Sequence, residues 1–205
     1  MPRLSADEPF LHPEVTLHGD ISLGRYVEIG RNGRITNAAI GDYGFCDRYV
    51  DIANADIGKM ASIAAFARIG AVDHPLERAV LSHFTYRSND YWDDAEPDDT
   101  VFARRRARRV TIDHDVWIGA GAQIKPEVTM GIGSVAAAGA LVTKDVPSFW
   151  IVAGLPAKPL RRRFPDAICD GLEQLALWDW DHDTLRARLD DLRALSAEQI
   201  LERYG

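Results

Sequence analysis

The feature that most constrains the fold is an apolar residue that recurs every six positions between residues 112 and 142. A period of six matches neither the 3.6-residue repeat of an α-helix nor the alternation of a long strand. It suits very short strands that turn a corner every six residues, so that three of them complete one coil. Hexapeptide repeats are typical of a parallel β-helix. The recurring positions are Ile112, Ile118, Ile124, Met130, Ala136 and Leu141 or Val142.

The same rhythm runs through residues 15–70. Most steps between the large apolar residues are six, but two of them are five, from Ile35 to Ile40 and from Ile52 to Ile57. These two slips lie 17 residues apart, so each coil is predicted to be one residue short at the same corner. Coils stack about 4.8 Å apart through parallel ladder hydrogen bonds. The predicted interior ladders are 23/40/57, 29/46/63 and 35/52/69.

These patterns predict an all-β solenoid of about five coils that occupies residues 15–165. Residues 1–14 are expected to form an extended lead-in. Residues 72–109 have no hexapeptide phase, so they form an insertion, and insertions in a solenoid emerge as loops, often on the binding face. Apolar residues at helical spacing after Pro165 predict a helical cap over residues 166–205, with capping-box spacing between Ser196 and Gln199.

Composition narrows the classes of function. The chain has 205 residues and a formal net charge of −7, which argues against nucleic acid or an anionic membrane surface as the main partner. Two cysteines do not make a disulfide framework, and neither an 18-residue apolar run nor a signal-peptide pattern occurs. We therefore expect a cytoplasmic protein.

Four motifs together resemble the left-handed β-helix acyltransferases. Within them, the chain is similar to the branch of the xenobiotic (chloramphenicol or streptogramin) and galactoside acetyltransferases, over about residues 15–165. This resemblance implies a left-handed coil, acetyl-CoA as the co-substrate, a small-molecule acceptor, and a homotrimer with active sites in the clefts between subunits. The motifs are Asp115-Val-Trp-Ile-Gly119, Ala138-Gly-Ala140, Val142-Thr-Lys-Asp-Val-Pro147 and Ala153-Gly-Leu-Pro-Ala157.

A second, narrower resemblance comes from the insertion. His74-Pro75, His83-Phe-Thr-Tyr86 and the tryptophan-rich tail look like a sub-branch associated with phosphonate-metabolism operons.

The candidate general base is His74, which directly follows the first block of repeats. Related enzymes carry a catalytic histidine in this context. Acetyl transfer to an alcohol or amine needs the acceptor proton removed during attack, and a neutral imidazole can accept it near pH 7. The alternatives are His83 as the base, or a surface histidine without a catalytic task.

The resemblance also implies a set of cofactor-binding residues. Trp117 is expected to point outward from the prism and to be covered by the pantetheine arm or by a neighbouring subunit, with subunit packing alone as the alternative. Basic residues suit the phosphates of coenzyme A, although each could be an ordinary solvated charge. The full set is Trp117, Ala120, Ala138, Thr143, Lys144, Lys158 and Arg161.

The expected acceptor contacts are Asp73, Tyr86 and Asp90, all in the insertion. The acceptor itself is left open among a drug, a sugar, a small amine and a phosphonate metabolite. The basic run Arg104–Arg109 either forms a wall for an anionic ligand or pairs with the acidic run Asp93–Asp99.

Two other functions fit the same architecture. The first is a non-catalytic solenoid, which would serve as a binding or assembly module and would not consume a thioester. A zinc enzyme like the γ-class carbonic anhydrases needs three convergent imidazoles. The six histidines here have no such clustered spacing, so no metal is expected.

Overall fold

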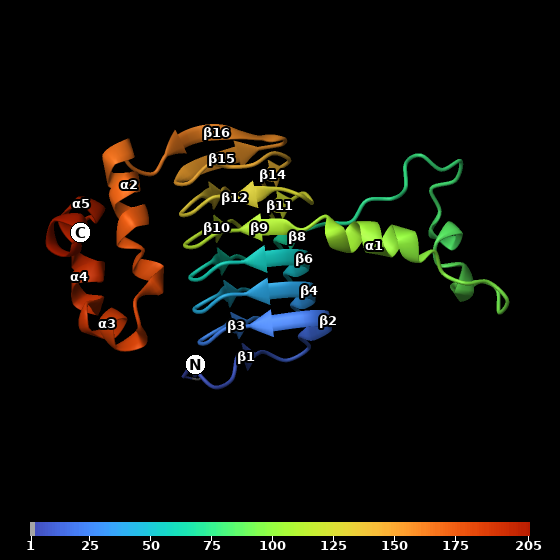
Figure 1. The fold of residues 1–205 in the computed structure, drawn as a ribbon, viewed down its shortest axis with the longest axis horizontal. Coiled ribbons are helices and arrows are strands. Elements are labelled where there is room, and N and C mark those ends of the chain that lie inside the picture. Colours follow the sequence, from blue (N-terminus) through green and yellow to red (C-terminus); the bar gives the residue numbers. More distant parts are fainter. Residues whose placement is uncertain (1–2) are drawn as a thin grey trace.

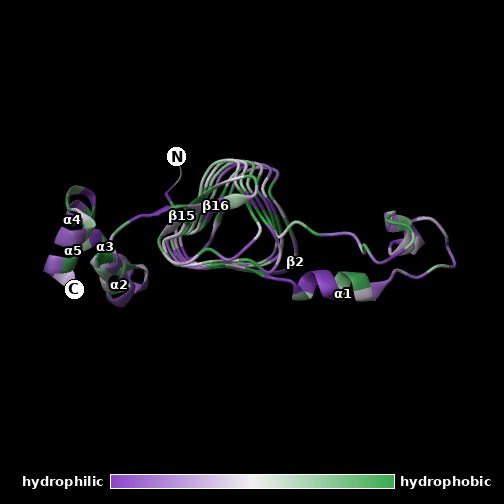
Figure 2. Cartoon of the chain, turned by 90° about the horizontal axis from the view of Figure 1, so that it is seen from above, coloured by the Kyte–Doolittle hydropathy of each residue, from purple (hydrophilic) through white to green (hydrophobic). Residues whose placement is uncertain are grey.

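Short parallel strands stack into a three-sided prism in the computed structural model, which describes residues 3–205 (Figures 1 and 2). One side is a sheet in which each strand pairs with the strand of the next coil. Its order is β1 (Phe10–Leu11), β3 (Glu28–Ile29), β5 (Phe45–Cys46), β7 (Ser62–Ile63), β10 (Trp117–Ile118), β13 (Val135–Ala136), β15 (Trp150–Gly154) and β16 (Ala157–Arg162).

A second sheet supplies the other two sides. Three longer strands in it bend around a corner, so their first halves belong to one side and their second halves to the other. Thus β6 pairs with β8 through residues 51–52 and with β9 through residues 55–57. The strands are β2 (Thr16–Leu23), β4 (Arg34–Ile40), β6 (Asp51–Ile57), β8 (Arg68–Ile69), β9 (Val110–Ile112), β11 (Gln123–Ile124), β12 (Thr129–Met130) and β14 (Leu141–Val142).

The interior ladders are confirmed by the strand registers. Ile29 lies opposite Cys46, Cys46 opposite Ile63, and Ile63 opposite Ile118. The 23/40/57 and 35/52/69 ladders also hold. Their side chains fill the prism and are almost completely buried, except for the partly buried Leu23 in the first coil. Because Ile63 pairs directly with Ile118, residues 72–109 interrupt a single solenoid.

Asparagine builds the corner at which the coils are one residue short. Asn37 and Asn54 adopt the left-handed conformation, with φ of 47° and 51°. Asparagine tolerates this region because its short amide bonds locally. The Asn37 Oδ1 accepts a hydrogen bond from the Asp20 amide at 3.2 Å, and its Nδ2 donates to Asn54 Oδ1 at 3.4 Å. Gly19 occupies the same corner with φ of 70°.

The stack is longer than the five coils expected from the repeats, since seven strands from β1 to β15 lie parallel on one side. Two segments outside the clear repeat add the extra rungs. Residues 10–11 of the lead-in pair with β3, and β15 pairs with β13. The last strand, β16, then runs antiparallel to β15 and covers its edge.

The C-terminal helices lie along one flank of the prism rather than over its end (Figure 1). Trp178 stacks on His114 with ring centroids 5.4 Å apart, and His182 stacks on Tyr26 at 4.4 Å. The predicted capping box at Ser196 is confirmed. The elements are α2 (Asp166–Leu175), the 3₁₀-helix η3 (Leu177–Asp179), α3 (His182–Ala187), α4 (Leu189–Ala194) and α5 (Ala197–Tyr204).

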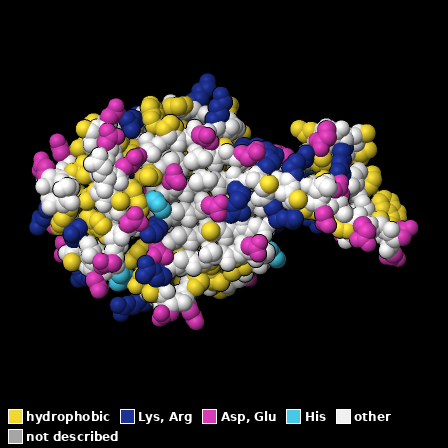
Figure 3. Space-filling model, in the orientation of Figure 1, with side chains coloured by type: hydrophobic (Ala, Val, Ile, Leu, Met, Phe, Trp, Pro, Cys, Tyr) yellow, Lys and Arg dark blue, Asp and Glu magenta, His cyan; other side chains and the backbone are white. Residues whose placement is uncertain are grey.

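Residues 72–109 form an arm that projects from the opposite flank (Figures 1 and 2). The sequence predicts only a loop here, but the arm contains η1 (His83–Thr85), η2 (Ser88–Asp90) and the helix α1 (Asp99–Ala107). The carboxylate of Asp98 caps α1 by accepting from the Thr100 amide, and it also pairs with Arg78. These contacts fold the arm on itself, and Figure 3 shows hydrophobic side chains at its far end.

The root of the arm is held by ion pairs. The Asp73 carboxylate binds Lys125 of the prism at 3.0 Å and Arg108, just after α1, also at 3.0 Å. The basic run is therefore largely paired, but with acidic residues outside the run Asp93–Asp99. The other partners of the basic run are Asp56 for Arg109, Glu77 for Arg104 and Glu127 for Arg108.

We predict that Ser134→Ala stabilises the fold. The Ser134 hydroxyl is fully buried and finds no hydrogen-bond partner among residues 3–205. Removing a buried unpaired hydroxyl should raise the free energy of unfolding by about 1 kcal/mol, measurable by urea denaturation. The control is Ser62→Ala on the exposed side of β7, which should change it by less than about 0.5 kcal/mol. A destabilised Ser134→Ala variant would contradict this reading of the core.

We predict that Asp73→Asn loosens the arm. The hydrogen bond from Lys125 lowers the pKa of Asp73, burial opposes this shift, and Arg108 adds to it. A lowered pKa in the folded state means that the ion pairs contribute stability above roughly pH 4, and that this is lost as the pH falls through the folded value. At pH 7 the variant should therefore exchange the amide hydrogens of residues 72–109 faster, whereas Asp93→Asn at the exposed tip should not. Equal exchange in Asp73→Asn and the unmodified protein would contradict the prediction.

Candidate active site

His74 lies at the root of the arm with its ring held by a backbone carbonyl. Its Nδ1 is 2.8 Å from the Leu81 oxygen. A carbonyl oxygen only accepts, so Nδ1 carries the hydrogen and the neutral ring has its lone pair on Nε2. The residue is exposed. This geometry leaves Nε2 available to take a proton from a bound molecule.

The three candidate acceptor contacts have different surroundings. Tyr86 is only 3% exposed, and its hydroxyl is 3.3 Å from His74 Nδ1. The Asp73 carboxylate is occupied by Lys125 and Arg108. Asp90 lies in η2, farther out on the arm, with its side chain in solvent. The fold therefore brings Asp73 and Tyr86 to His74 but leaves Asp90 apart from this cluster.

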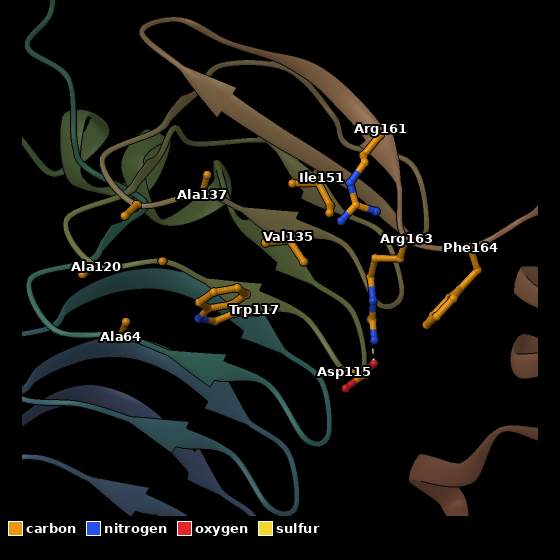
Figure 4. Close-up of a pocket in the computed structure, with 12 residues that line it drawn as sticks. Ala64, Asp115, Trp117, Ala120, Val135, Ala137, Ile151, Arg161, Arg163 and Phe164 are labelled. Carbon is orange, nitrogen blue, oxygen red and sulfur yellow. Dashed lines mark hydrogen bonds and ion pairs between the residues drawn. The ribbon is translucent and has the colours of Figure 1, made fainter. Parts of the chain in front are cut away.

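Four of the predicted cofactor residues meet in one groove on the side of the prism that contains β10 and β13. This tryptophan groove has a volume of about 690 Å³ and includes Trp117, Ala120, Ala138 and Arg161. Trp117 is 55% exposed and points outward, as predicted, while its neighbour Ile118 is buried. Figure 4 shows the small alanines toward one end of the groove and the arginines at the other.

The groove also contains residues that the sequence analysis did not single out. Arg163 donates to Asp115 at 2.9 Å and to the Gly133 oxygen at 2.8 Å, and its guanidinium lies 5.1 Å from the Phe164 ring centroid. These residues close one end of the groove because β16 folds back antiparallel. Pro147, Pro156 and Pro159 predict an extended chain in this segment. They do not predict that β16 turns back and pairs antiparallel with β15.

Thr143 and Lys144 line a different hollow, of about 490 Å³, which we call the basic cavity. It also contains Arg108 of the basic run, Lys125, which the sequence analysis did not select, and the acidic residues Glu127 and Asp145. Both of these cations bind Asp73, the residue before His74, so the basic cavity borders the root of the arm. The register explains the position of Thr143, because β14 stacks on β11 and places residue 143 over residue 125. Lys158 is exposed on β16 and lines neither hollow.

The tryptophan groove and His74 lie on different sides of one chain. The groove is on the sheet that ends in β15 and β16, whereas the arm leaves from a corner of the second sheet (Figure 2). The arrangement thus offers an apolar groove with arginines at one end, and separately an imidazole beside a hollow lined by both cations and carboxylates.

No helix among residues 3–205 is long and apolar enough to cross a membrane. Within the same range, no three or more histidine, cysteine, aspartate or glutamate side chains are grouped so that they could hold a metal ion.

The chain is similar to chloramphenicol acetyltransferases along most of its length. It is 32% identical over 169 residues to the enzyme of Escherichia coli, covering 78% of each chain. It is 31% identical over 196 residues to the enzyme of Klebsiella aerogenes, covering 89% of this chain and 88% of the relative. No family model matches the chain.

A solved structure shares the fold. A mutant of AntD, an N-acyltransferase from Bacillus cereus, in complex with dTDP and coenzyme A, matches with a TM-score of 0.50 at 18% identity, covering 81% of this chain and 86% of that chain. The resemblance to the xenobiotic acetyltransferases inferred from the four motifs is thus confirmed. The chain belongs to the hexapeptide-repeat acetyltransferase family that includes the chloramphenicol acetyltransferases, and it is an acetyltransferase whose donor is acetyl-CoA.

Proposed function

We propose that the protein moves the acetyl group of acetyl-CoA to a hydroxyl or amine of a small molecule, with His74 as general base. The observation that carries this proposal is the Nδ1 hydrogen bond to Leu81, which leaves a free lone pair on an exposed Nε2. Nε2 takes the proton of the acceptor as its oxygen or nitrogen attacks the thioester carbon. The carbon–sulfur bond then breaks, and the proton leaves with the coenzyme A thiol.

The tryptophan groove suits the pantetheine arm of the donor. Trp117, Val135 and Ile151 give it apolar walls, and Ala120 and Ala138 leave the backbone accessible. A thin chain can lie against such a surface and bond to peptide groups. The cations at the ends of the two hollows suit the phosphates, since arginine and lysine bind phosphate through charge-assisted hydrogen bonds. These are Arg161 for the groove and Lys144 for the basic cavity, with Thr143 beside Lys144. Lys158, exposed on β16 outside both hollows, is the least supported of the proposed phosphate contacts.

We further propose a homotrimer of left-handed prisms. In one chain the groove and His74 occupy different sides of the prism, so a complete site needs the groove of one subunit and the arm of another. The outward aromatic residues on the groove side also favour a covered surface, because Phe45 is 39% and Trp117 is 55% exposed. A cyclic trimer would repeat the same pairing of groove and arm three times.

The proposed acceptor is a class of compound, a small molecule with a hydroxyl or an amine group. Asp73 and Tyr86 are engaged in the cluster around His74, so Asp90 is the freest of the three proposed contacts. The panel to test contains an antibiotic alcohol, a sugar, a small amine and an aminophosphonate. Activity on the last would support the resemblance to the phosphonate sub-branch. The cytoplasmic location stays a prediction from composition.

His74→Ala should reduce kcat by about a hundredfold to ten-thousandfold, the usual contribution of a general base. Release of the coenzyme A thiol, followed with a thiol reagent and the best acceptor in the panel, measures this. Affinity for acetyl-CoA by calorimetry should stay unchanged, because His74 lies outside the groove. His83→Ala is the matched control and should keep its rate. Full turnover by His74→Ala would disprove the assignment of the base.

Mixing two inactive variants tests whether sites are shared between subunits. Ala138→Trp should fill the groove, while His74→Ala removes the base. If each site combines the two, trimers reassembled from equal amounts should recover about a quarter of normal activity by random assortment. Light scattering should give three times the chain mass. A mixture that stays inactive although both variants assemble would show that groove and base act within one chain.

A further inference from the structure

We propose that Tyr86 and Arg105 are positioning residues that hold the His74 ring in its reactive tautomer and orientation. This inference rests on the proposed role of His74 as the general base. It goes beyond it because neither residue has to touch the donor or the acceptor: they act through His74 and the peptide group just before it.

Tyr86 supplies a second oxygen at the protonated ring nitrogen. Its hydroxyl is 3.3 Å from His74 Nδ1, on which Leu81 already accepts at 2.8 Å. The two rings meet at 67° with their centroids 6.0 Å apart. If the imidazole turned over, a carbon would replace Nδ1 and both oxygens would face C–H groups instead of a donor. The pair of oxygens therefore disfavours the flipped ring.

The tyrosine is itself fixed in place. Its side chain is 3% exposed and packs edge-on against Phe102 of α1, with centroids 5.9 Å apart. A buried phenol with so little open surface has scarcely any area to offer a substrate. Its position beside Nδ1 gives it a different use, which is to set where the ring of His74 can lie.

Arg105 ties this tyrosine to the backbone that carries His74. Its Nε and Nη2 donate to the Asp73 carbonyl oxygen at 3.0 and 2.6 Å. Nη2 is also 3.3 Å from the Tyr86 hydroxyl, and the guanidinium carbon lies 4.7 Å from the Tyr86 ring centroid. One planar group thus holds the peptide before His74, the hydroxyl beside its ring and the face of Tyr86. Lysine could not make these contacts together, because its ammonium group is not planar and does not present several donors in fixed directions.

A second histidine–tyrosine pair on the arm lacks these supports and so provides a control. The Tyr91 hydroxyl is 2.9 Å from His83 Nε2, and both residues are exposed. Arg104, the neighbour of Arg105 on α1, pairs with Glu77 at the surface. Tyr91→Phe and Arg104→Gln therefore match the two test substitutions in chemistry and location without touching His74.

The experiment compares Tyr86→Phe and Arg105→Gln with these controls. Misplacing a catalytic group by about 1 Å can cost up to about a hundredfold in rate. We expect kcat to fall by about tenfold or more in Arg105→Gln and less in Tyr86→Phe, with the KM for acetyl-CoA unchanged. Arg105→Lys should not restore the rate. Both controls should keep normal kcat.

The same substitutions in the His74→Ala background give the decisive result. Residues that act through His74 should cause no further loss once it is absent, since coupled groups are not additive. A nitrogen-15 NMR spectrum should also show Nδ1–H as the single neutral tautomer of His74 in the unmodified protein and a mixture in Tyr86→Phe. That measurement keeps the test valid if Arg105→Gln does not fold.

Two outcomes separate the inference from the proposed function. Suppose that His74→Ala is impaired but Tyr86→Phe and Arg105→Gln are fully active. The positioning role is then wrong and the base assignment stands. The same conclusion follows if the two substitutions reduce kcat by the same factor in the His74→Ala background as in the unmodified protein. If His74→Ala itself keeps full turnover, the base assignment fails and this inference fails with it.

Discussion

The structure depends on the parallel backbone pairing of one coil with the next, about 17 or 18 residues later in the chain. This pairing sets the stacking distance, and the isoleucines inside the prism make it specific. A slip of one residue along a strand would turn the apolar side chain outward and the polar one inward. The side chains that face solvent are thereby fixed as well. Trp117 points outward because Ile118 points inward.

The same constraint positions the arm. Because Ile63 pairs with Ile118 across the insertion, the prism continues as if the arm were absent, and the arm can only emerge from a corner. Asp73 then meets Lys125 of the prism, and Arg108 meets Asp73 where the chain returns. His74 follows Asp73 directly, so the rigidity of the prism extends to a histidine on an otherwise projecting segment.

Much of the fold could be predicted from spacing alone. The repeat of six, the two short corners and the ladders at 29/46/63 are local patterns, and each was enough to locate a rung. The helix α1 could not be foreseen, since its arginine-rich sequence has no apolar stripe and its stability comes from the Asp98 cap and partners elsewhere in the chain. The return of β16 likewise depends on the edge that β15 presents.

The candidate site was predictable only in part, for a related reason. His74, Trp117 and the two alanines occur in motifs, whereas Arg105 and Lys125 acquire meaning through residues far away in sequence. Their partner in both cases is Asp73, 32 and 52 residues distant. Side-chain pairs so far apart in the chain produce no repeating pattern that could be recognised in a single sequence.

The closeness of the two ends of the arm has a consequence for how such proteins can diversify. A side chain on Gly70 would collide with the Ala53 oxygen and lie within contact distance of Val110. The polypeptide therefore leaves and rejoins the prism at nearly the same point. The entropy of closing a loop grows only slowly with its length. Changes in the length or sequence of the arm beyond the cluster around His74 should therefore cost little free energy, and selectivity for new acceptors could evolve without disturbing the prism or the base.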